Sequence, residues 1–384
     1  MICYLDNSAT TRPLDEVTDF ICEINKNFYG NPSSLHSIGF DAEKIVKKAR
    51  ETVLASIGDI DGTLVFTAGG TESNNLAIIG YIKNKLKRSP KIITSKIEHP
   101  SVTEPFMYLK EEGADVHFCA PNEKGMIDLA ELESMVDEKT ELVSLMLVNN
   151  EVGSVLSAAK ACEIIKRKNP KAIFHVDAVQ AYGKVPINVK KMGIDMLSIS
   201  GHKINGPKGI GALYVRQGIT LLPVMLGGHQ EKNLRSGTEN VPAIGGLLKA
   251  AERVNQNLMQ NIEKMSYLKN MLLEELKKIP FCHINGGDGE GFAPNIINAS
   301  FDFLKSEVLL HSLEKRGVFV SSGSACSSNK PAPSHVLSAM GLDRKRVDTA
   351  IRISLCPENT EEEILYAIDV IKEETKALYD ILKR

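Results

Sequence analysis

Short apolar runs alternate with segments of helical periodicity through the first half of the chain. The apolar runs cover residues 63–67, 91–94, 142–148, 172–176 and 196–200, and the helical patterns cover residues 72–86, 102–112 and 158–168. The run at 142–148 is almost continuous, as in a strand that is buried on both faces. This alternation predicts an α/β fold with a mostly parallel sheet and helices on both of its faces. Ligands of such sheets bind at the carboxyl ends of the strands.

The pattern changes after Gly246, where a long helical stretch extends to about residue 278. The segments that follow predict a strand, a helix, a short strand and a final helix, at residues 295–303, 307–316, 318–320 and 360–382. We therefore predict two domains. The large domain spans residues 15–255, and a smaller α/β domain spans residues 256–384, with residues 1–14 packed against it.

Composition excludes several classes of function. The chain has 384 residues, 43% of them hydrophobic and 24% charged, and a net charge of −2. Such a balance is ordinary for a soluble globular protein and lacks the basic excess of a nucleic-acid-binding protein. No apolar run reaches the roughly 18 residues that span a bilayer. The first residues lack the pattern of a signal peptide, so we expect a cytoplasmic protein without membrane contact.

Lys203 lies just past the apolar run at 196–200, in a segment rich in turn-forming residues. A desolvated amine at such a strand end can form a Schiff base with a carbonyl cofactor such as pyridoxal 5'-phosphate. The neighbouring side chains of Ser200 and His202 can donate hydrogen bonds to a phosphate. The alternative is a solvated lysine of a loop, as most lysines are.

Three other strand ends carry polar residues. Gly70 and Thr71 stand between a predicted strand and a predicted helix, where a phosphate could bind the helix N-terminus, although a simple N-cap turn would look the same. His99 could stack on an aromatic cofactor and carry protons, or be a surface or capping histidine. Asn150 follows the most apolar strand and needs polar partners, which a turn alone could also supply.

Asp177 follows the apolar run at 172–176, where a buried carboxylate is costly without a cationic partner. The protonated pyridine nitrogen of pyridoxal phosphate is one such partner, and a structural salt bridge is the alternative. Gln180 stands three residues further on and could reach the phenolic oxygen of the same cofactor.

The seven cysteines are odd in number and contain no Cys-x-x-Cys pair. This argues against a disulfide framework and against a cysteine-rich metal site, and we expect no metal. Most of these thiols have apolar neighbours. Cys326 instead lies among serines, glycine and alanine at residues 321–328, on a segment that we expect to be exposed and mobile. We interpret it as a reactive thiol.

Taken together, these segments resemble the NifS/IscS-type cysteine desulfurases, which are pyridoxal phosphate enzymes with the aspartate-aminotransferase fold. The resemblance covers essentially the whole chain. The segments that carry it are residues 5–11, 29–34, 71–77, 149–153, 175–180, 200–203, 235–238, 321–328 and 351–355. Their number and order make a chance match implausible.

The resemblance implies a role for each candidate residue. Lys203 would bind the cofactor covalently, His99 would stack on its ring, and Cys326 would accept sulfur. The other cofactor-binding residues would be Gly70, Thr71, Asn150, Asp177, Gln180, Ser200, His202 and, across a homodimer interface, Thr238. Asn31 and Arg352 would bind the substrate carboxylate, for which a guanidinium fork is well shaped.

The implied reaction removes sulfur from L-cysteine and leaves alanine and a persulfide on Cys326. A sulfur-acceptor protein would then receive the sulfur for iron–sulfur cluster assembly, tRNA thiolation or another use. The chain departs from the family in two ways. Cys356 stands where many relatives have glycine, and we expect it to be structural. The chain ends at Arg384, without the C-terminal extension that some members use to dock a scaffold protein.

Two alternatives remain open at this point. Another reaction of the same cofactor, such as that of a selenocysteine lyase or a cysteine sulfinate desulfinase, would depend less on Cys326. A non-catalytic partner protein could keep the fold as an interaction platform, but we would then expect it to have lost the lysine, the aspartate or the cysteine.

Overall fold

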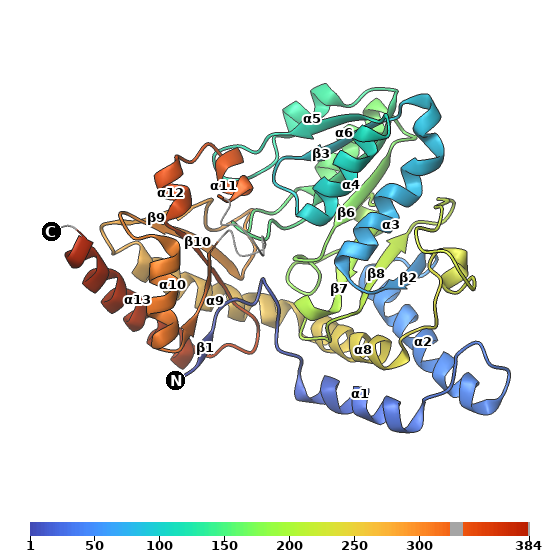
Figure 1. Ribbon diagram of the computed structural model, residues 1–384, viewed down its shortest axis with the longest axis horizontal. Helices are drawn as coiled ribbons and strands as arrows, with labels where there is room; N and C mark the ends of the chain where they lie inside the picture. Colours follow the sequence, from blue (N-terminus) through green and yellow to red (C-terminus); the bar gives the residue numbers. More distant parts are fainter. Residues whose placement is uncertain (323–332, 383–384) are drawn as a thin grey trace.

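The computed structural model describes residues 1–322 and 333–382. Its largest element is a seven-stranded sheet (Figure 1). In spatial order the strands are β2 (Thr63–Thr67), β8 (Gly211–Val215), β7 (Met196–Ser200), β6 (Ile173–Asp177), β5 (Thr140–Met146), β3 (Lys91–Ser95) and β4 (Asp115–Cys119). Only β8 runs antiparallel to its neighbours, so the carboxyl ends of the other six strands share one edge.

Successive side chains of these strands enter different cores, as the two-residue period of a strand requires. On β3, for example, Ile92 and Ile93 are both fully buried and belong to separate hydrophobic clusters. The cluster of Ile92 is completed by α3 (Gly70–Ile82) and α4 (Pro100–Glu111). The opposite face packs on α1 (Asp15–Asn27), α2 (Ser37–Ser56), α5 (Leu129–Met135), α6 (Ala158–Lys168) and α8 (Val241–Gln256). Both faces are therefore covered.

A second, antiparallel sheet has four strands in the order β12 (Ser321–Ser322), β13 (Ala350–Ser354), β10 (Ile296–Phe301) and β9 (Cys282–Asn285). It packs on three helices at the left of Figure 1, which are α9 (Leu258–Leu276), α10 (Ser306–Lys315) and α13 (Glu361–Leu382). Because β13 is an inner strand, Arg352 at its middle lies between Asn298 and Ser321 of its neighbours.

The N-terminal segment joins the two sheets. Strand β1 (Cys3–Tyr4) pairs in parallel with β11 (Val318–Phe319), and Cys3 and Leu5 belong to the hydrophobic cluster of the second sheet. Further along, the Thr11 backbone N–H donates to the carbonyl of His202 at 2.9 Å, beside the first sheet. One short segment thus contacts the residues that follow β7 and the strands of the second sheet.

The expected α/β architecture and all five predicted strands of the first sheet are present, with β2 and β7 at the predicted bounds. The long helical stretch expected after Gly246 consists of α8 and α9, which Asn257 separates. The division into domains at residue 255 remains a prediction.

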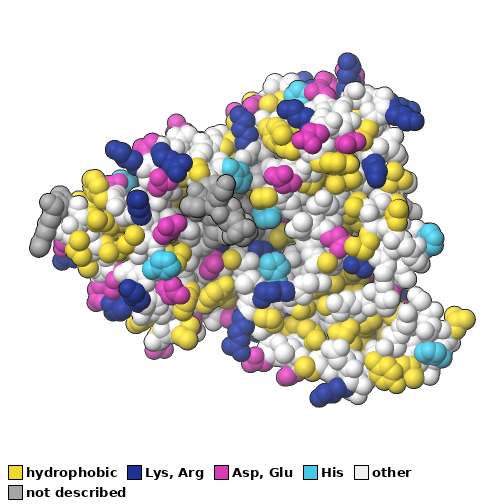
Figure 2. All heavy atoms as spheres, in the orientation of Figure 1, with side chains coloured by type: hydrophobic (Ala, Val, Ile, Leu, Met, Phe, Trp, Pro, Cys, Tyr) yellow, Lys and Arg dark blue, Asp and Glu magenta, His cyan; other side chains and the backbone are white. Residues whose placement is uncertain are grey.

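Charged side chains of both signs are intermixed over the face seen in Figure 2, in keeping with the small net charge. Over residues 1–322 and 333–382, no helix is at once long enough and apolar enough to span a lipid bilayer.

Candidate active site

A cavity of about 320 Å³ lies at the carboxyl ends of β6 and β7, between the first sheet and Arg352 of β13. Most of the predicted site residues line it, although they come from segments more than 280 residues apart. The lining residues are Ser8, Ala9, Gly70, Thr71, His99, Ser101, Met146, Val148, Asn150, Asp177, Val179, Gln180, Ser200, His202, Lys203 and Arg352.

Lys203 ends a short 3-10 turn, η2 (Gly201–Lys203), that directly follows β7. Its Nζ donates to the backbone carbonyls of Ser8 and Ala9, at 2.5 and 2.8 Å. The chain turns sharply here because the Gly201 N–H donates to Ile210 O and the Gly206 N–H donates to Gly201 O, at 3.0 Å each. The strand end and these two backbone acceptors hold the amine at the cavity.

Asp177 is the last residue of β6 and is 5% exposed. Its Oδ2 accepts a hydrogen bond from the Asn74 side-chain amide at 2.8 Å, and its Oδ1 accepts one from the Val179 N–H at 2.9 Å. Both donors are neutral, and among the described residues no ion pair with Asp177 is found. A buried carboxylate in this state favours a cationic group placed in the cavity.

His99 forms the N-cap of α4 and turns one edge of its ring toward that helix. Its Nδ1 accepts from the Ser101 N–H at 3.1 Å and lies 2.8 Å from Ser101 Oγ. Burial lowers the pKa of His99, and the nearby Lys203 and His335 lower it further, while Asp177 acts in the opposite direction. His99 is therefore a neutral imidazole at pH 7.

The opposite end of the cavity suits a phosphate. Helix α3 begins at Gly70, so its unpaired N–H groups and its positive dipole end face this region. A side chain at position 70 would place its Cβ 2.5 Å from Val179 Cγ2, so any larger residue here would displace the Val179 side chain. The Oγ of Ser200 is buried there without a partner among the described residues.

His202 also lines the cavity, and its Nδ1 lies 3.2 Å from the hydroxyl of Thr10. Burial, together with the charges of Lys203, Lys208 and Lys184, lowers the pKa of His202 to about 4. At neutral pH this ring is therefore a neutral hydrogen-bonding group.

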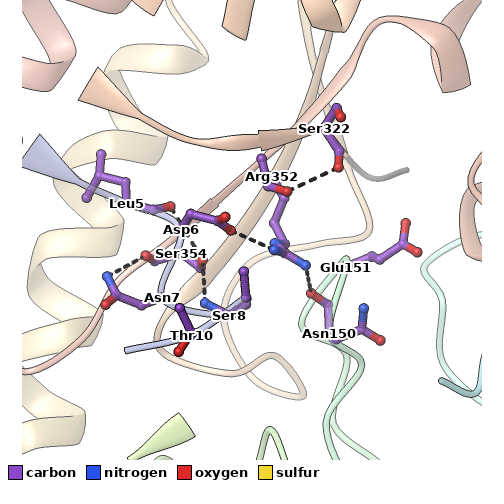
Figure 3. A network of polar contacts seen from close by, with 12 residues as sticks. Leu5, Asp6, Asn7, Ser8, Thr10, Asn150, Glu151, Ser322, Arg352 and Ser354 are labelled. Carbon is purple, nitrogen blue, oxygen red and sulfur yellow. Dashed lines mark hydrogen bonds and ion pairs between the residues drawn. The ribbon is translucent and has the colours of Figure 1, made fainter. Parts of the chain in front are cut away.

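Arg352 is almost fully buried and reaches the cavity from the second sheet (Figure 3). One Nη donates to Asp6 Oδ1 at 2.7 Å, and the other donates to the carbonyl of Asn150 at 3.1 Å. Its Nε is buried without a partner among the described residues. The guanidinium is thus fixed in position by two acceptors, and its Nε–H remains available as a donor.

Three predicted residues stand apart from this group. Asn31 and Thr238 are exposed and do not line the cavity. Cys326 lies outside the described residues. The described residues on either side of it lie close to the cavity. Ser322 follows Ser321, the pairing partner of Arg352, and Ser334 Oγ donates to the carboxylate of Glu151 at 2.5 Å.

Four residues of the site were not predicted from the sequence. Ser8, Asp6, Asn74 and Ser101 supply the contacts to Lys203, Arg352, Asp177 and His99 described above. Asn74 carries the one signal that could have been used, because it is a polar residue on the apolar face of a predicted helix and is fully buried. A buried amide of this kind needs partners.

Comparison with known proteins agrees with this geometry. Residues 3–366 match the model of the family described as Aminotransferase class-V. The "Cysteine desulfurase 1" of Trichormus variabilis is 45% identical, over 97% of this chain and 92% of that protein. The "Cysteine desulfurase IscS 1" of Archaeoglobus fulgidus is 40% identical, over 94% of each chain.

Solved structures show the same relationship. A "NIFS-LIKE PROTEIN" superposes with a TM-score of 0.92 at 39% identity and covers 98% of this chain and 100% of its own. A structure described as "SspA in complex with cysteine" superposes with a TM-score of 0.82 at 33% identity, over 93% of this chain and 100% of its own. The expected fold is thereby confirmed, and the chain belongs to the class-V aminotransferases and, within them, to the cysteine desulfurase family.

Proposed function

We propose that the protein is a pyridoxal phosphate-dependent cysteine desulfurase that converts L-cysteine to L-alanine and collects the sulfur as a persulfide on Cys326. The observation that carries this proposal is the meeting of Lys203, Asp177 and His99 in one cavity that Arg352 enters from the second sheet. An amine, a buried carboxylate, a neutral imidazole and a guanidinium are the groups that such a reaction requires.

The residues present fit pyridoxal phosphate. Lys203 would hold it through its amine, and Asp177 would hold the protonated ring nitrogen. The N-terminus of α3, with Thr71, Ser200 and His202, would hold the phosphate. Gln180 donates through Nε2 to Ser8 O at 2.8 Å, and its Oε1 is buried without a partner among the described residues. When bound, the cofactor supplies an electron sink that stabilises negative charge at the substrate Cα.

The chain's own residues would then act in order. Arg352 would bind the substrate carboxylate, which fixes the orientation of the amino acid. The amine of Lys203, once released, would remove the Cα proton. His99 would stay neutral and pack on the cofactor ring, and Asn150 would lie on the phenolic oxygen side. Cys326, as a thiolate, would attack the sulfur of the substrate.

The transfer balances without an external oxidant. The Cβ–S bond of L-cysteine breaks and the S–S bond of the persulfide forms. The substrate Cβ is reduced to the methyl group of alanine while the sulfur pair is oxidised, and the proton of the Cys326 thiol ends on carbon. A reductant or an acceptor thiol is needed only to release the sulfur afterwards.

The protein would work as a homodimer with composite sites. Asn31 and Thr238 lie outside the cavity of their own chain, and large apolar side chains near them are exposed. Tyr29 is 71% exposed, Leu35 is fully exposed and Leu226 is 80% exposed. Burial of these side chains against a second copy would bring Thr238 to the phosphate of the partner site and Asn31 to the substrate.

The sulfur would pass to an acceptor protein, in iron–sulfur cluster assembly or in tRNA thiolation, in the cytoplasm. The name IscS among the relatives favours the first of these two uses. Direct binding of a nucleic acid or of a membrane is not required.

A Cys326→Ser variant tests the proposal. It should bind pyridoxal phosphate with an unchanged absorbance spectrum and yet release less than about 1% of the wild-type sulfide from L-cysteine under reducing conditions. The matched control is Cys22→Ser, which removes an exposed thiol of α1 and should keep full activity. Full activity of Cys326→Ser with L-cysteine would overturn the persulfide step. Activity with L-cysteine sulfinate or L-selenocysteine alone would favour the other two reactions.

A further inference from the structure

A line of short polar contacts connects Asp177 to His99 through two residues that have no assigned role. Asn74 Nδ2 lies 2.8 Å from Asp177 Oδ2 and 2.9 Å from Ser101 Oγ. Ser101 Oγ in turn lies 2.8 Å from His99 Nδ1. The line crosses from β6 through α3 to the first turn of α4, beneath the cavity.

The direction of each hydrogen bond in this line is fixed by chemistry. An ionised Asp177 only accepts, so one N–H of the Asn74 amide is used there. The other N–H of that amide points to Ser101 Oγ, which must accept it. The hydroxyl hydrogen of Ser101 is therefore left for His99 Nδ1. The backbone N–H of Ser101, which can only donate, points to the same nitrogen at 3.1 Å.

Burial keeps the line in this single arrangement. The side chain of Asn74 is fully buried on α3, and Ser101 is 7% exposed. Rotation of the Asn74 amide by half a turn would bring its oxygen against the Asp177 carboxylate, which is repulsive. Because both side chains are buried, bulk water replaces a lost hydrogen bond poorly, and the arrangement that satisfies every group is favoured.

We propose that Asn74 and Ser101 are positioning residues that hold His99 in one tautomer, with its single ring proton on Nε2 and with Nδ1 closed to protonation. This inference rests on the proposed function, because it assigns how the ring above the cofactor is kept neutral. His99 then acts as a fixed donor and a stacking surface, and it cannot take a second proton without breaking this line.

The charges around the His99 ring act in opposite directions on its protonation, so a fixed tautomer has a clear effect. Asp177 on β6 favours the imidazolium form of His99, whereas Lys203 after β7 and His335 on α11 (His335–Ala339) oppose it. The backbone neighbour Glu98 is buried and adds no charge when protonated. The hydroxyl and the backbone N–H of Ser101 both donate to Nδ1 of His99, so protonation of that nitrogen would break two hydrogen bonds. This cost opposes the tendency of the Asp177 charge to favour the imidazolium form.

The experiment uses the holoenzyme and nitrogen-15 NMR of its histidine rings, with His99→Gln to assign the signal of His99. Wild-type protein should show an unprotonated Nδ1 and a protonated Nε2 from about pH 8 down to the acid limit of folding. In Ser101→Ala one donor is lost, so protonation of His99 should move upward into the pH range in which the protein is folded. The kcat should fall by about 3–10-fold, with little change in KM. Ser101→Thr, which keeps the hydroxyl, should restore both values.

Asn74→Leu should have the same effect as Ser101→Ala, and the double variant should be no worse than either single one. The matched control is Asn75→Ala, which removes the next amide of α3. Among the described residues, that amide donates to Thr71 O of its own helix. If Asn74→Leu fails to fold, the comparison of Ser101→Ala with Ser101→Thr decides. Two results would overturn the inference. One is a protonated Nδ1 of His99 in the wild-type protein, and the other is a His99 ring that titrates in Ser101→Ala as it does in Asn75→Ala.

The two proposals fail in different ways. A protein without desulfurase activity whose His99 shows the Nε2 tautomer would contradict the proposed function and leave the positioning role intact. An active desulfurase whose His99 titrates identically in wild type and Ser101→Ala would support the proposed function and contradict the positioning role.

Discussion

Arg352 and Asp6 form an ion pair of 2.7 Å at the wall of the cavity, although they are separated by almost the whole chain (Figure 3). The guanidinium is 5% exposed and the carboxylate 21% exposed. Asp6 therefore fixes one end of the guanidinium and balances part of its charge before a substrate arrives. Under the proposed function, the substrate carboxylate would share Arg352 with Asp6.

Arg352→Lys should raise the KM for L-cysteine by about 10–100-fold and change kcat much less. Lysine keeps the charge but loses the planar fork, and one charge-assisted hydrogen bond contributes about 1.5–3 kcal/mol. Steady-state kinetics over a range of L-cysteine concentrations measures the effect. Arg344→Lys, in an exposed ion pair with Asp348, is the matched control and should leave KM unchanged. An unchanged KM in Arg352→Lys would show that the carboxylate binds elsewhere.

Asp177→Asn should change stability more with pyridoxal phosphate than without it. Without it, the variant removes a buried charge but turns one accepting oxygen into an amide NH2 that faces a donor, so the two effects should partly cancel. With it, the variant also loses the partner of the ring nitrogen, and the gain in Tm on cofactor addition should shrink by several degrees. Thermal unfolding with and without added cofactor checks both expectations. An equal gain in the two proteins would exclude a contact between Asp177 and the ring.

Glu98 should make the protein less stable as pH rises. Burial, with a smaller contribution from the charge of Asp177, raises the pKa of Glu98 from its ordinary value of 4.5 to about 8. Between these two values the unfolded chain releases a proton that the folded chain keeps, so the stabilising contribution is complete below about 4.5 and is lost as pH rises through about 8. Glu98→Gln removes this loss.

Urea unfolding at pH 5.5, 7 and 8.5 tests that expectation. The free energy of unfolding of Glu98→Gln minus that of wild type should increase with pH, by about 1 kcal/mol per unit across the window. Glu112→Gln, at the exposed end of α4, is the matched control. A difference that falls with pH would mean that Glu98 is ionised in the folded protein.

Cys356 should be chemically inert. Burial raises the pKa of its thiol to about 12, so almost none of it is thiolate at pH 7. Cys356→Ser should keep persulfide formation at the wild-type rate and lower the free energy of unfolding by about 1–2 kcal/mol, because a hydroxyl replaces a buried thiol. Mass spectrometry after brief iodoacetamide treatment should find Cys22, which is exposed, modified long before Cys356.

Local patterns were sufficient for five of the seven strands of the large sheet, because these strands are short, apolar and separated by helices. The run at 196–200 predicted β7 at its observed bounds, and the rule that ligands bind at strand ends placed Asp177 and Lys203 together. Strands β4 and β8 were missed, although Gly211–Val215 is fully buried. Strand β8 returns antiparallel beside β7, which the strand–helix alternation does not encode.

The contacts between distant segments could not be predicted. Nothing near Asp6 in the sequence indicates a partnership with Arg352, because the two meet only after β1 has joined the second sheet. The line from Asp177 to His99 likewise depends on which way the Asn74 side chain points from α3. Such contacts follow from packing between elements rather than from the periodicity within one element.

Lys203 is held by the main-chain oxygens of Ser8 and Ala9 rather than by their side chains. Replacement of the Ser8 side chain by alanine would leave both acceptors in place, so Ser8→Ala would not reveal this contact. A deletion of one residue between Asp6 and Thr11 would instead shift the register of the segment. The same deletion would separate Lys203 from the carbonyls of residues 8 and 9 and would also separate Arg352 from the carboxylate of Asp6. The number of residues between Asp6 and Thr11 is therefore more strictly constrained than the identity of the side chains at positions 8 and 9.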